Sequence, residues 1–267
     1  MQIPLWNLLF FGIIMLMKKT SEIAKEYKAL TERDYESFIR EYESDERSAV
    51  IKNVESVRKK LTALENEKKR MYMMYEFERK YPDCTYICGV DEVGRGPLAG
   101  PVVAGAVILP KDCDILYLND SKQLSEKKRE DLFVQIMEKA VATGIGQADS
   151  KRIDEINILQ ADYEAMREAI GKLGVMPEVL LNDAVTIPMI DITQVPIIKG
   201  DTKSASIAAA SIIAKVTRDH MMESYDSVYP EYGFASNKGY GSAAHIEAIK
   251  KYGPCPIHRR SFIGNFI

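Results

Sequence analysis

The chain has 267 residues, 46% hydrophobic and 28% charged, so it can bury a full core and does not have the composition of a disordered protein. Its 36 basic and 39 acidic residues leave a formal net charge of −3, which excludes nucleic-acid binding driven by a globally positive surface. The four cysteines lack paired short spacing and the chain has three histidines, which disfavours a zinc site and predicts reduced thiols.

The first 17 residues form an apolar leader that contains Trp6. The apolar run is roughly 15 residues long, short of the ~20 needed to span a bilayer. No basic residue precedes it and no small-residue cleavage site follows it, so a secretory signal fits poorly. We therefore expect an over-extended start or a disordered tail, with Met15 or Met17 as a more natural first residue, and a chain without a membrane anchor.

Residues 18–83 are expected to form a helical N-terminal extension. Residues 20–80 are rich in charge, contain no glycine or proline, and carry apolar residues at helical spacing. Thr31 with Asp34 predicts a capping box, and Ser44 predicts a second helix N-terminus. The extension should hold two or three helices.

The last of these helices shows an apolar heptad pattern, interrupted at Lys68. The pattern comprises Val50, Val54, Val57, Leu61, Leu64, Met71 and Tyr75. Packing within a helical hairpin is the favoured interpretation, because acidic residues are mixed through the same face. The alternative is a hairpin that lies along a duplex and uses Lys59, Lys60, Lys68, Lys69 and Arg70.

After Pro82 the composition changes to β-branched runs that alternate with helical stretches, so residues 84–267 form the second predicted domain. Strands are predicted at residues 86–90, 101–109, 144–148, 179–183 and 195–198. Helices are predicted at residues 127–141, 159–173 and 203–225. This alternation predicts an α/β fold, a sheet covered by helices.

Two adjacent acids, Asp91 and Glu92, follow the first predicted strand and precede a glycine turn. Holding two charges near a core is costly, and metal binding is the simplest reason for it. The turn itself, Gly94, Arg95 and Gly96, combines a backbone that a ligand can approach closely with a guanidinium suited to an anion.

Two further acids stand where other elements end. Asp183 closes the run VLLND, and Asp201 precedes the long small-residue helix. Carboxylates without histidine suit Mg²⁺ better than zinc. Two such ions, roughly 4 Å apart, can activate water and neutralise a leaving oxygen in phosphodiester hydrolysis. For Asp201 alone, a helix cap is an equally good interpretation.

Other candidate contacts are weaker. Lys122 stands in a loop where it can meet a phosphate, and Lys203 with Ser204 can do so at a helix N-terminus. Tyr240, between two glycines, can stack on a nucleotide or anchor a loop, and residue type alone favours the anchor. Arg218 with Asp219 is expected as a surface pair, and residues 258–260 as an unspecific basic cluster.

A family resemblance rests on five strings that occur in order: GVDEVGRGPLAGPVVAGAVIL, DSKQLS, LLND, KGDTKSASIAAASIIAKVTRD and NKGYGSAAH. With them, the chain from about residue 86 onward closely resembles bacterial ribonuclease HII, the type 2 ribonuclease H. The resemblance implies a ribonuclease H-like mixed β-sheet flanked by helices, preceded by the helical extension and followed by C-terminal helical segments.

It also implies an endonuclease that cuts the RNA strand of RNA–DNA hybrids and cuts 5′ to single ribonucleotides in duplex DNA, leaving 3′-hydroxyl and 5′-phosphate ends. Such an enzyme removes embedded ribonucleotides and RNA primers. The family's four catalytic, metal-binding carboxylates fall on Asp91, Glu92, Asp183 and Asp201, with Mg²⁺ or Mn²⁺ as the implied cofactor. The GRG motif at residues 94–96 matches the element that senses the ribose 2′-hydroxyl.

The resemblance further matches Tyr240 to a tyrosine that stacks beside the same sugar and Lys122 to a lysine near the substrate backbone. The related ribonuclease HIII usually carries a β-containing N-terminal domain, so the helical extension favours HII. A catalytically silent nucleic-acid-binding module is the rival from another class. We expect a cytoplasmic monomer, and no sequence feature identifies a replication or repair partner.

Overall fold

The computed structural model describes residues 18–265, so the apolar leader lies outside the described residues. Within them, the chain forms two compact units, which divide between Arg70 and Met71. None of the helices in the described range is both long enough and apolar enough to cross a membrane.

The N-terminal unit is helical. It contains α2 (Thr20–Ala29), α3 (Tyr35–Tyr42) and most of α4 (Ser48–Met74), with the one-turn helix η1 (Glu32–Asp34) between the first two. The predicted capping box is present at η1, where the Thr31 N–H donates to the Asp34 carboxylate over 2.9 Å. The predicted cap at Ser44 is wrong, because α4 begins at Ser48.

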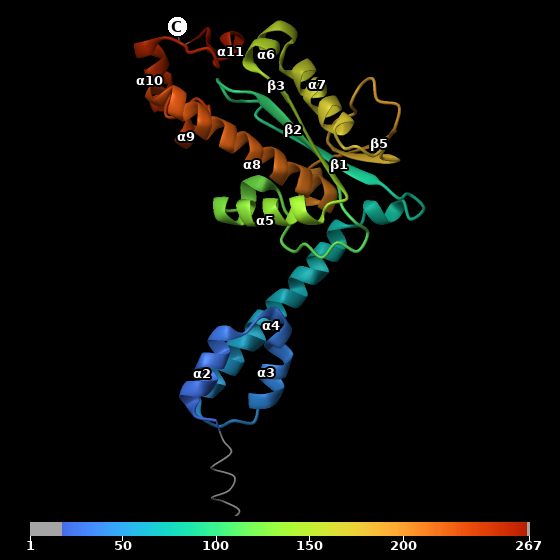
Figure 1. Ribbon diagram of the computed structural model, residues 1–267, viewed down its shortest axis with the longest axis vertical. Helices are drawn as coiled ribbons and strands as arrows, with labels where there is room; N and C mark the ends of the chain where they lie inside the picture. The colour runs from blue at the N-terminus through green and yellow to red at the C-terminus, as the bar shows by residue number, and fades with distance from the viewer. Residues whose placement is uncertain (1–17, 266–267) are drawn as a thin grey trace, which may run out of the picture. The chain divides into compact units, whose positions relative to one another are not determined.

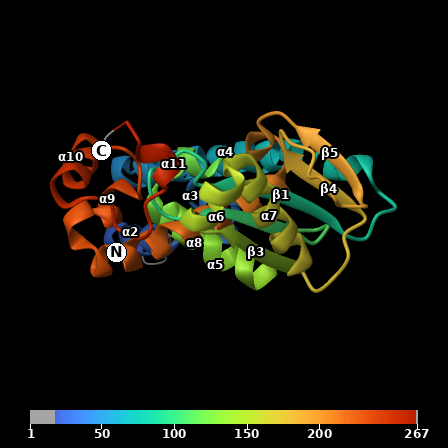
Figure 2. The same ribbon diagram turned by 90° about the horizontal axis from the view of Figure 1, so that it is seen from above.

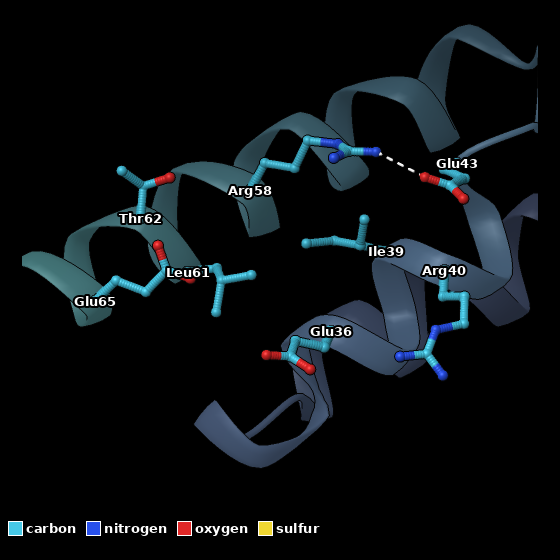
Figure 3. A pocket seen from close by; sticks show the side chains of 8 residues that line it. All are labelled: Glu36, Ile39, Arg40, Glu43, Arg58, Leu61, Thr62 and Glu65. Atoms are coloured by element: carbon cyan, nitrogen blue, oxygen red, sulfur yellow. Dashed lines mark hydrogen bonds and ion pairs between the residues drawn. The ribbon is translucent and has the colours of Figure 1, made fainter.

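The heptad residues at the start of α4 bury their side chains against α2 and α3, as the hairpin interpretation predicts. This core contains Ile23, Phe38, Ile39, Tyr42, Val50, Val54 and Val57. Beside it, a groove of about 490 Å³ opens between α3 and α4, with a salt bridge of 3.0 Å from Arg58 to Glu43 at its edge (Figure 3). Its charged lining mixes three glutamates with two arginines: Glu36, Glu43, Glu65, Arg40 and Arg58. A groove of this charge is poorly suited to a polyanion.

The second unit is built on a mixed five-stranded sheet in the order β3-β2-β1-β4-β5 (Figures 1 and 2). The strands are β1 (Ile87–Val93), β2 (Val102–Ile108), β3 (Ala142–Ala148), β4 (Val179–Asp183) and β5 (Thr193–Ile197). β1 pairs antiparallel with β2 and parallel with β4, so it is the central strand. The predicted α/β class and the five strands are confirmed.

Helices cover both faces of this sheet (Figure 1). On one face, α8 (Ala205–Val228) packs on β1 and β2, and α5 (Glu126–Lys139) packs on α8. On the other face, α7 (Ile158–Gly171) packs on β2 and β3. The helices lie close because the strands present glycines: a Cβ at Gly105 would lie 2.4 Å from the Ala210 carbonyl oxygen, and one at Gly146 would lie 2.0 Å from that of Ala165. This explains the small-residue composition of α8.

The remaining elements include one helix that the sequence did not predict, α6 (Ser150–Ile156). It is capped by Asp149, whose carboxylate accepts from the N–H of Arg152 over 2.7 Å. The C-terminal helical segments are α9 (Phe234–Asn237), α10 (Ala243–Tyr252) and α11 (Arg260–Ile263). Three further one-turn helices of this unit carry residues discussed below: η2 (Glu78–Lys80), η3 (Ser121–Gln123) and η4 (Gly200–Thr202).

Candidate active site

The two adjacent acids lie inside the central strand rather than in the turn after it. Asp91 pairs with Gly105 and Glu92 with Ala104 of β2, so β1 ends three residues later than predicted. Its pairing with β4 ends at Val90 opposite Asn182. The next residues along the two parallel strands are Asp91 and Asp183, which therefore lie side by side near the carboxyl ends of β1 and β4.

The other predicted acid, Asp201, lies in η4, which follows β5. The N–H of Gly200 donates to Oδ1 of Asp183 over 2.7 Å, which holds η4 against the end of β4. Asp201 is 8% exposed, and the charges of Asp120 and Asp183 act on it. The fold thus brings all four predicted carboxylates to one edge of the sheet.

The carboxylates disfavour each other's negative charge. Burial raises the pKa of Asp91 well above its usual range, and Glu92 and Asp183 raise it further, while the Ser211 hydroxyl opposes the rise. Burial also raises the pKa of Glu92, which Arg95 opposes. A cation stabilises the negative charge of crowded, poorly solvated carboxylates. Carboxylate oxygens are the ligands that Mg²⁺ and Mn²⁺ prefer.

No set of three His, Cys, Asp or Glu side chains within residues 18–265 is already gathered as a metal site. The donor set fits a hard divalent cation, because it offers oxygen ligands and excess negative charge without histidine or thiolate.

Lys122 lies beside these acids. It belongs to η3, which Asp120 caps by accepting from the Lys122 N–H over 2.9 Å. Although burial acts in the other direction, Asp120, Asp91 and Asp201 raise the pKa of Lys122, and Tyr240 adds to the rise. The predicted substrate-backbone lysine is thus next to both the carboxylates and the predicted stacking tyrosine.

The glycine turn and Tyr240 face each other. A Cβ added at Gly96 would lie 3.9 Å from Cε1 of Tyr240, whose side chain is 44% exposed. Gly94 has a φ of +94°, which only glycine adopts without strain. Arg95 makes ion pairs of 3.6 Å with Glu92 and with Asp162. The turn therefore lies between the carboxylates of β1 and the ring of Tyr240.

The prediction that Ser204 meets a phosphate is not supported. Ser204 is buried and caps α8, and its hydroxyl donates to Oε1 of Glu78 over 2.7 Å. The N–H of Ser206 donates to the same oxygen over 3.0 Å, so a carboxylate already occupies the place of an anion. Lys203 is exposed and donates to the carbonyl of Ile198 over 2.9 Å. The sequence did not predict this role for Glu78, because Glu78 is one of many charged residues in the segment 20–80.

Two arginines that were predicted at the surface or in a basic cluster are buried. Arg218 was expected on the surface, but it is fully buried and donates to the carbonyls of Ala99, Pro101 and Lys238. Arg259 is fully buried as well. Its guanidinium donates to main-chain carbonyls of the glycine-turn region, namely Gly94, Arg95 and Gly100. These side chains therefore fix loops instead of meeting a nucleic acid.

Asp162 of α7 is a site neighbour that sequence reasoning missed. Its carboxylate is fully buried, and neither of its oxygens has a hydrogen-bond partner within the described chain. Burial, with a contribution from Glu92, raises the pKa of Asp162 to about 8, and Arg95 opposes the rise. In the sequence, Asp162 is one of several acids within a predicted helix, and no motif distinguishes it from the others.

We expect Asp162→Asn to stabilise the protein increasingly as the pH rises. The folded-state pKa is above the unfolded value of 3.8, so the cost of the charge is absent at low pH, grows through the window from about 4 to 8, and is complete above it. The gain in unfolding free energy should reach on the order of a few kcal/mol at pH 9 and be smaller at pH 5. Urea unfolding at both pH values measures it, with exposed Asp191→Asn as control. A gain that does not change with pH would contradict the assignment.

Comparisons with known proteins agree with this geometry. A family model described as Ribonuclease HII matches residues 88–265, and one described as Ribonuclease HII N-terminal domain matches residues 19–82. Ribonuclease HII of Lachnoclostridium phytofermentans is 64% identical over 247 residues, which cover 92% of this chain and 97% of the relative. Ribonuclease HII of Clostridioides difficile is 51% identical, with 94% and 99% covered.

Solved structures of type 2 ribonucleases H are similar to this chain as well. Ribonuclease H2 from Pyrococcus horikoshii is similar with a TM-score of 0.56 and 32% identity, over 66% of this chain and 93% of that one. The ribonuclease HII of the PCNA:RNase HII complex from Archaeoglobus fulgidus has a TM-score of 0.55 and 26% identity, over 66% and 94%.

The mixed sheet with acids on its central strand, together with these neighbours, defines a ribonuclease H, a hydrolase that acts as an endonuclease. The two family models cover nearly all of the described chain, and both describe domains of ribonuclease HII. The chain belongs to the ribonuclease HII family, which decides against the HIII alternative.

Proposed function

We propose that this protein cuts the RNA strand of RNA–DNA hybrids and incises duplex DNA on the 5′ side of single ribonucleotides, leaving 3′-hydroxyl and 5′-phosphate ends. It works as a cytoplasmic monomer in the removal of embedded ribonucleotides and RNA primers. The observation that carries the proposal is the position of the glycine turn, which lies between the carboxylates of β1 and the ring of Tyr240.

Asp91, Glu92, Asp183 and Asp201 are proposed to hold Mg²⁺ or Mn²⁺. When bound, the metal supplies an activated water and neutralises the leaving oxygen. The chain's own residues orient the substrate: Lys122, whose ammonium feels the charges of Asp91 and Asp201, is assigned to the phosphate backbone beside them. Lys203 is exposed and remains a weaker candidate for a backbone contact.

Recognition of the ribose is assigned to the turn and the tyrosine. The 2′-hydroxyl is the group that distinguishes a ribonucleotide from its deoxy neighbours. The main-chain groups of Gly94, Arg95 and Gly96 can approach it closely because a side chain is absent at two of the three positions. The ring of Tyr240, which neighbours Gly96, stacks on the same sugar.

The test uses three duplexes of one sequence: all DNA, DNA with one ribonucleotide, and an RNA–DNA hybrid. With Mg²⁺ or Mn²⁺ we expect the second and third to be cut and the first to stay intact, and chelation by EDTA should stop cleavage. Binding of the ribonucleotide duplex without incision under any of these conditions would favour the silent binding module instead.

A further inference from the structure

Two buried histidines connect the C-terminal segment to the loop that carries Tyr240. His245 lies in the first turn of α10 and His258 shortly before α11, and they are 0% and 2% exposed. Their Nε2 atoms are 3.0 Å apart. The rings pack against Tyr232 and Phe234, with centroids 4.9 Å apart for Tyr232 and His258. Solvent therefore does not supply the hydrogen-bond partners of either imidazole.

The direction of each hydrogen bond follows from one fixed donor. The main-chain N–H of Cys255 lies 3.0 Å from Nδ1 of His258, so this nitrogen accepts and the ring proton must be on Nε2. Nε2–H of His258 then donates to Nε2 of His245, which leaves the proton of His245 on Nδ1. That Nδ1–H donates to the carbonyl oxygen of Tyr240 over 2.8 Å. One tautomer of each ring satisfies all three bonds.

Both rings are neutral near pH 7, as these bonds require. Burial lowers the pKa of His258 to about 4, with a further lowering by His245, and burial lowers the pKa of His245. The Cys255 thiol lies 3.1 Å from Nδ1 of His258, whose single lone pair already accepts from the Cys255 N–H, and burial raises the pKa of this thiol.

The Tyr240 ring needs support of this kind. It is flanked by two glycines, and its guanidinium neighbour Arg218 is 6.0 Å from the ring centroid. A fixed main chain at Tyr240 therefore limits the positions that its ring can take. The carbonyl of Tyr240 accepts from the N–H of Ser242 over 2.8 Å as well as from His245, which uses both of its lone pairs.

We propose that His245 and His258 are positioning residues for Tyr240, joined in a hydrogen-bond relay that starts at the main chain of Cys255 and ends at the main chain of Tyr240. The proposal rests on the proposed function of Tyr240. Arg259, the residue after His258, donates to the carbonyls of Gly94 and Arg95. One short segment therefore contacts the main chain of both the glycine turn and, through His245, Tyr240.

A double-mutant cycle tests the relay. His245→Leu is expected to lower kcat/KM on the single-ribonucleotide duplex by about tenfold, and by less than about twofold when Tyr240→Ala is already present, because both changes act on one ring. His245→Asn retains a donor near the position of Nδ1 and should recover most of the loss. The exposed His220→Gln serves as control.

The tautomers are measured independently of activity by ¹⁵N NMR of the wild-type imidazoles. We expect the proton on Nδ1 of His245 and on Nε2 of His258. The opposite tautomers, or losses that simply add in the double variant, overturn the relay. Tyr240→Ala without any loss on the single-ribonucleotide duplex instead contradicts the proposed function of Tyr240, and with it the purpose of the relay.

Discussion

Asp91→Asn is expected to lower the rate of incision at a single ribonucleotide by about 10³-fold or more, because it removes one carboxylate from the buried edge of the central strand. Asparagine has nearly the same shape, so the strand pairing with β2 is retained. Single-turnover cleavage at saturating Mg²⁺ measures the loss. Asp131→Asn, an exposed change in α5, should leave the rate unchanged.

The same substitution should also raise the melting temperature in the absence of divalent ions. The raised pKa of Asp91 shows that its negative charge costs free energy in the folded state, and the neutral amide removes that cost. Added Mg²⁺ should therefore stabilise the wild type more than the variant. An unchanged rate of incision would remove Asp91 from the catalytic group, whatever the melting curves show.

Gly89→Ala is expected to reduce the unfolding free energy by about 3 kcal/mol or more, which corresponds to a fall in melting temperature of roughly 10 °C. A Cβ there would lie 2.0 Å from the carbonyl carbon of Ser206 and 2.3 Å from the nitrogen of Ile207. Both are main-chain atoms of α8, so the whole helix must move away from β1. Urea unfolding followed by circular dichroism measures the effect.

Gly171→Ala is the matched control for this change. Gly171 ends α7, and an added Cβ there would meet nothing within 4 Å. Because alanine favours the helix, we expect no loss of stability and a gain of up to about 1 kcal/mol. Equal destabilisation by the two substitutions would show that close packing of α8 on β1 is not the cause.

The sequence predicted β2 and β4 well because they are runs of aliphatic residues, VVAGAVI and VLLND. Val179–Asp183 is a strand over the predicted residues, whereas β1 extends through Asp91 and Glu92. Acids disfavour strands locally, and here the pairing with β2 outweighs that preference. Ser44 failed as a cap because Asp45 and Arg47 pair with each other before α4 begins.

The four candidate acids were visible in the sequence because each stands at the end of an apolar run or before a helix. Asp162, Glu78 and the buried arginines were not visible, because most of their partners lie 67 to 165 residues away, such as Gly94 for Arg259. Residue type marks His258 and Arg259 as basic, yet burial keeps His258 neutral and turns Arg259 to main-chain carbonyls. Only the fold shows that they face inward.

The most direct test of the account is a nucleotide-resolution map of cleavage in a DNA duplex with one ribonucleotide, compared with the same duplex carrying a 2′-deoxy or 2′-fluoro sugar at that position. We predict a single metal-dependent cut on the 5′ side of the ribonucleotide, which is lost with either sugar and in Asp91→Asn. Cleavage that continues without the 2′-hydroxyl, or that survives Asp91→Asn, would contradict it.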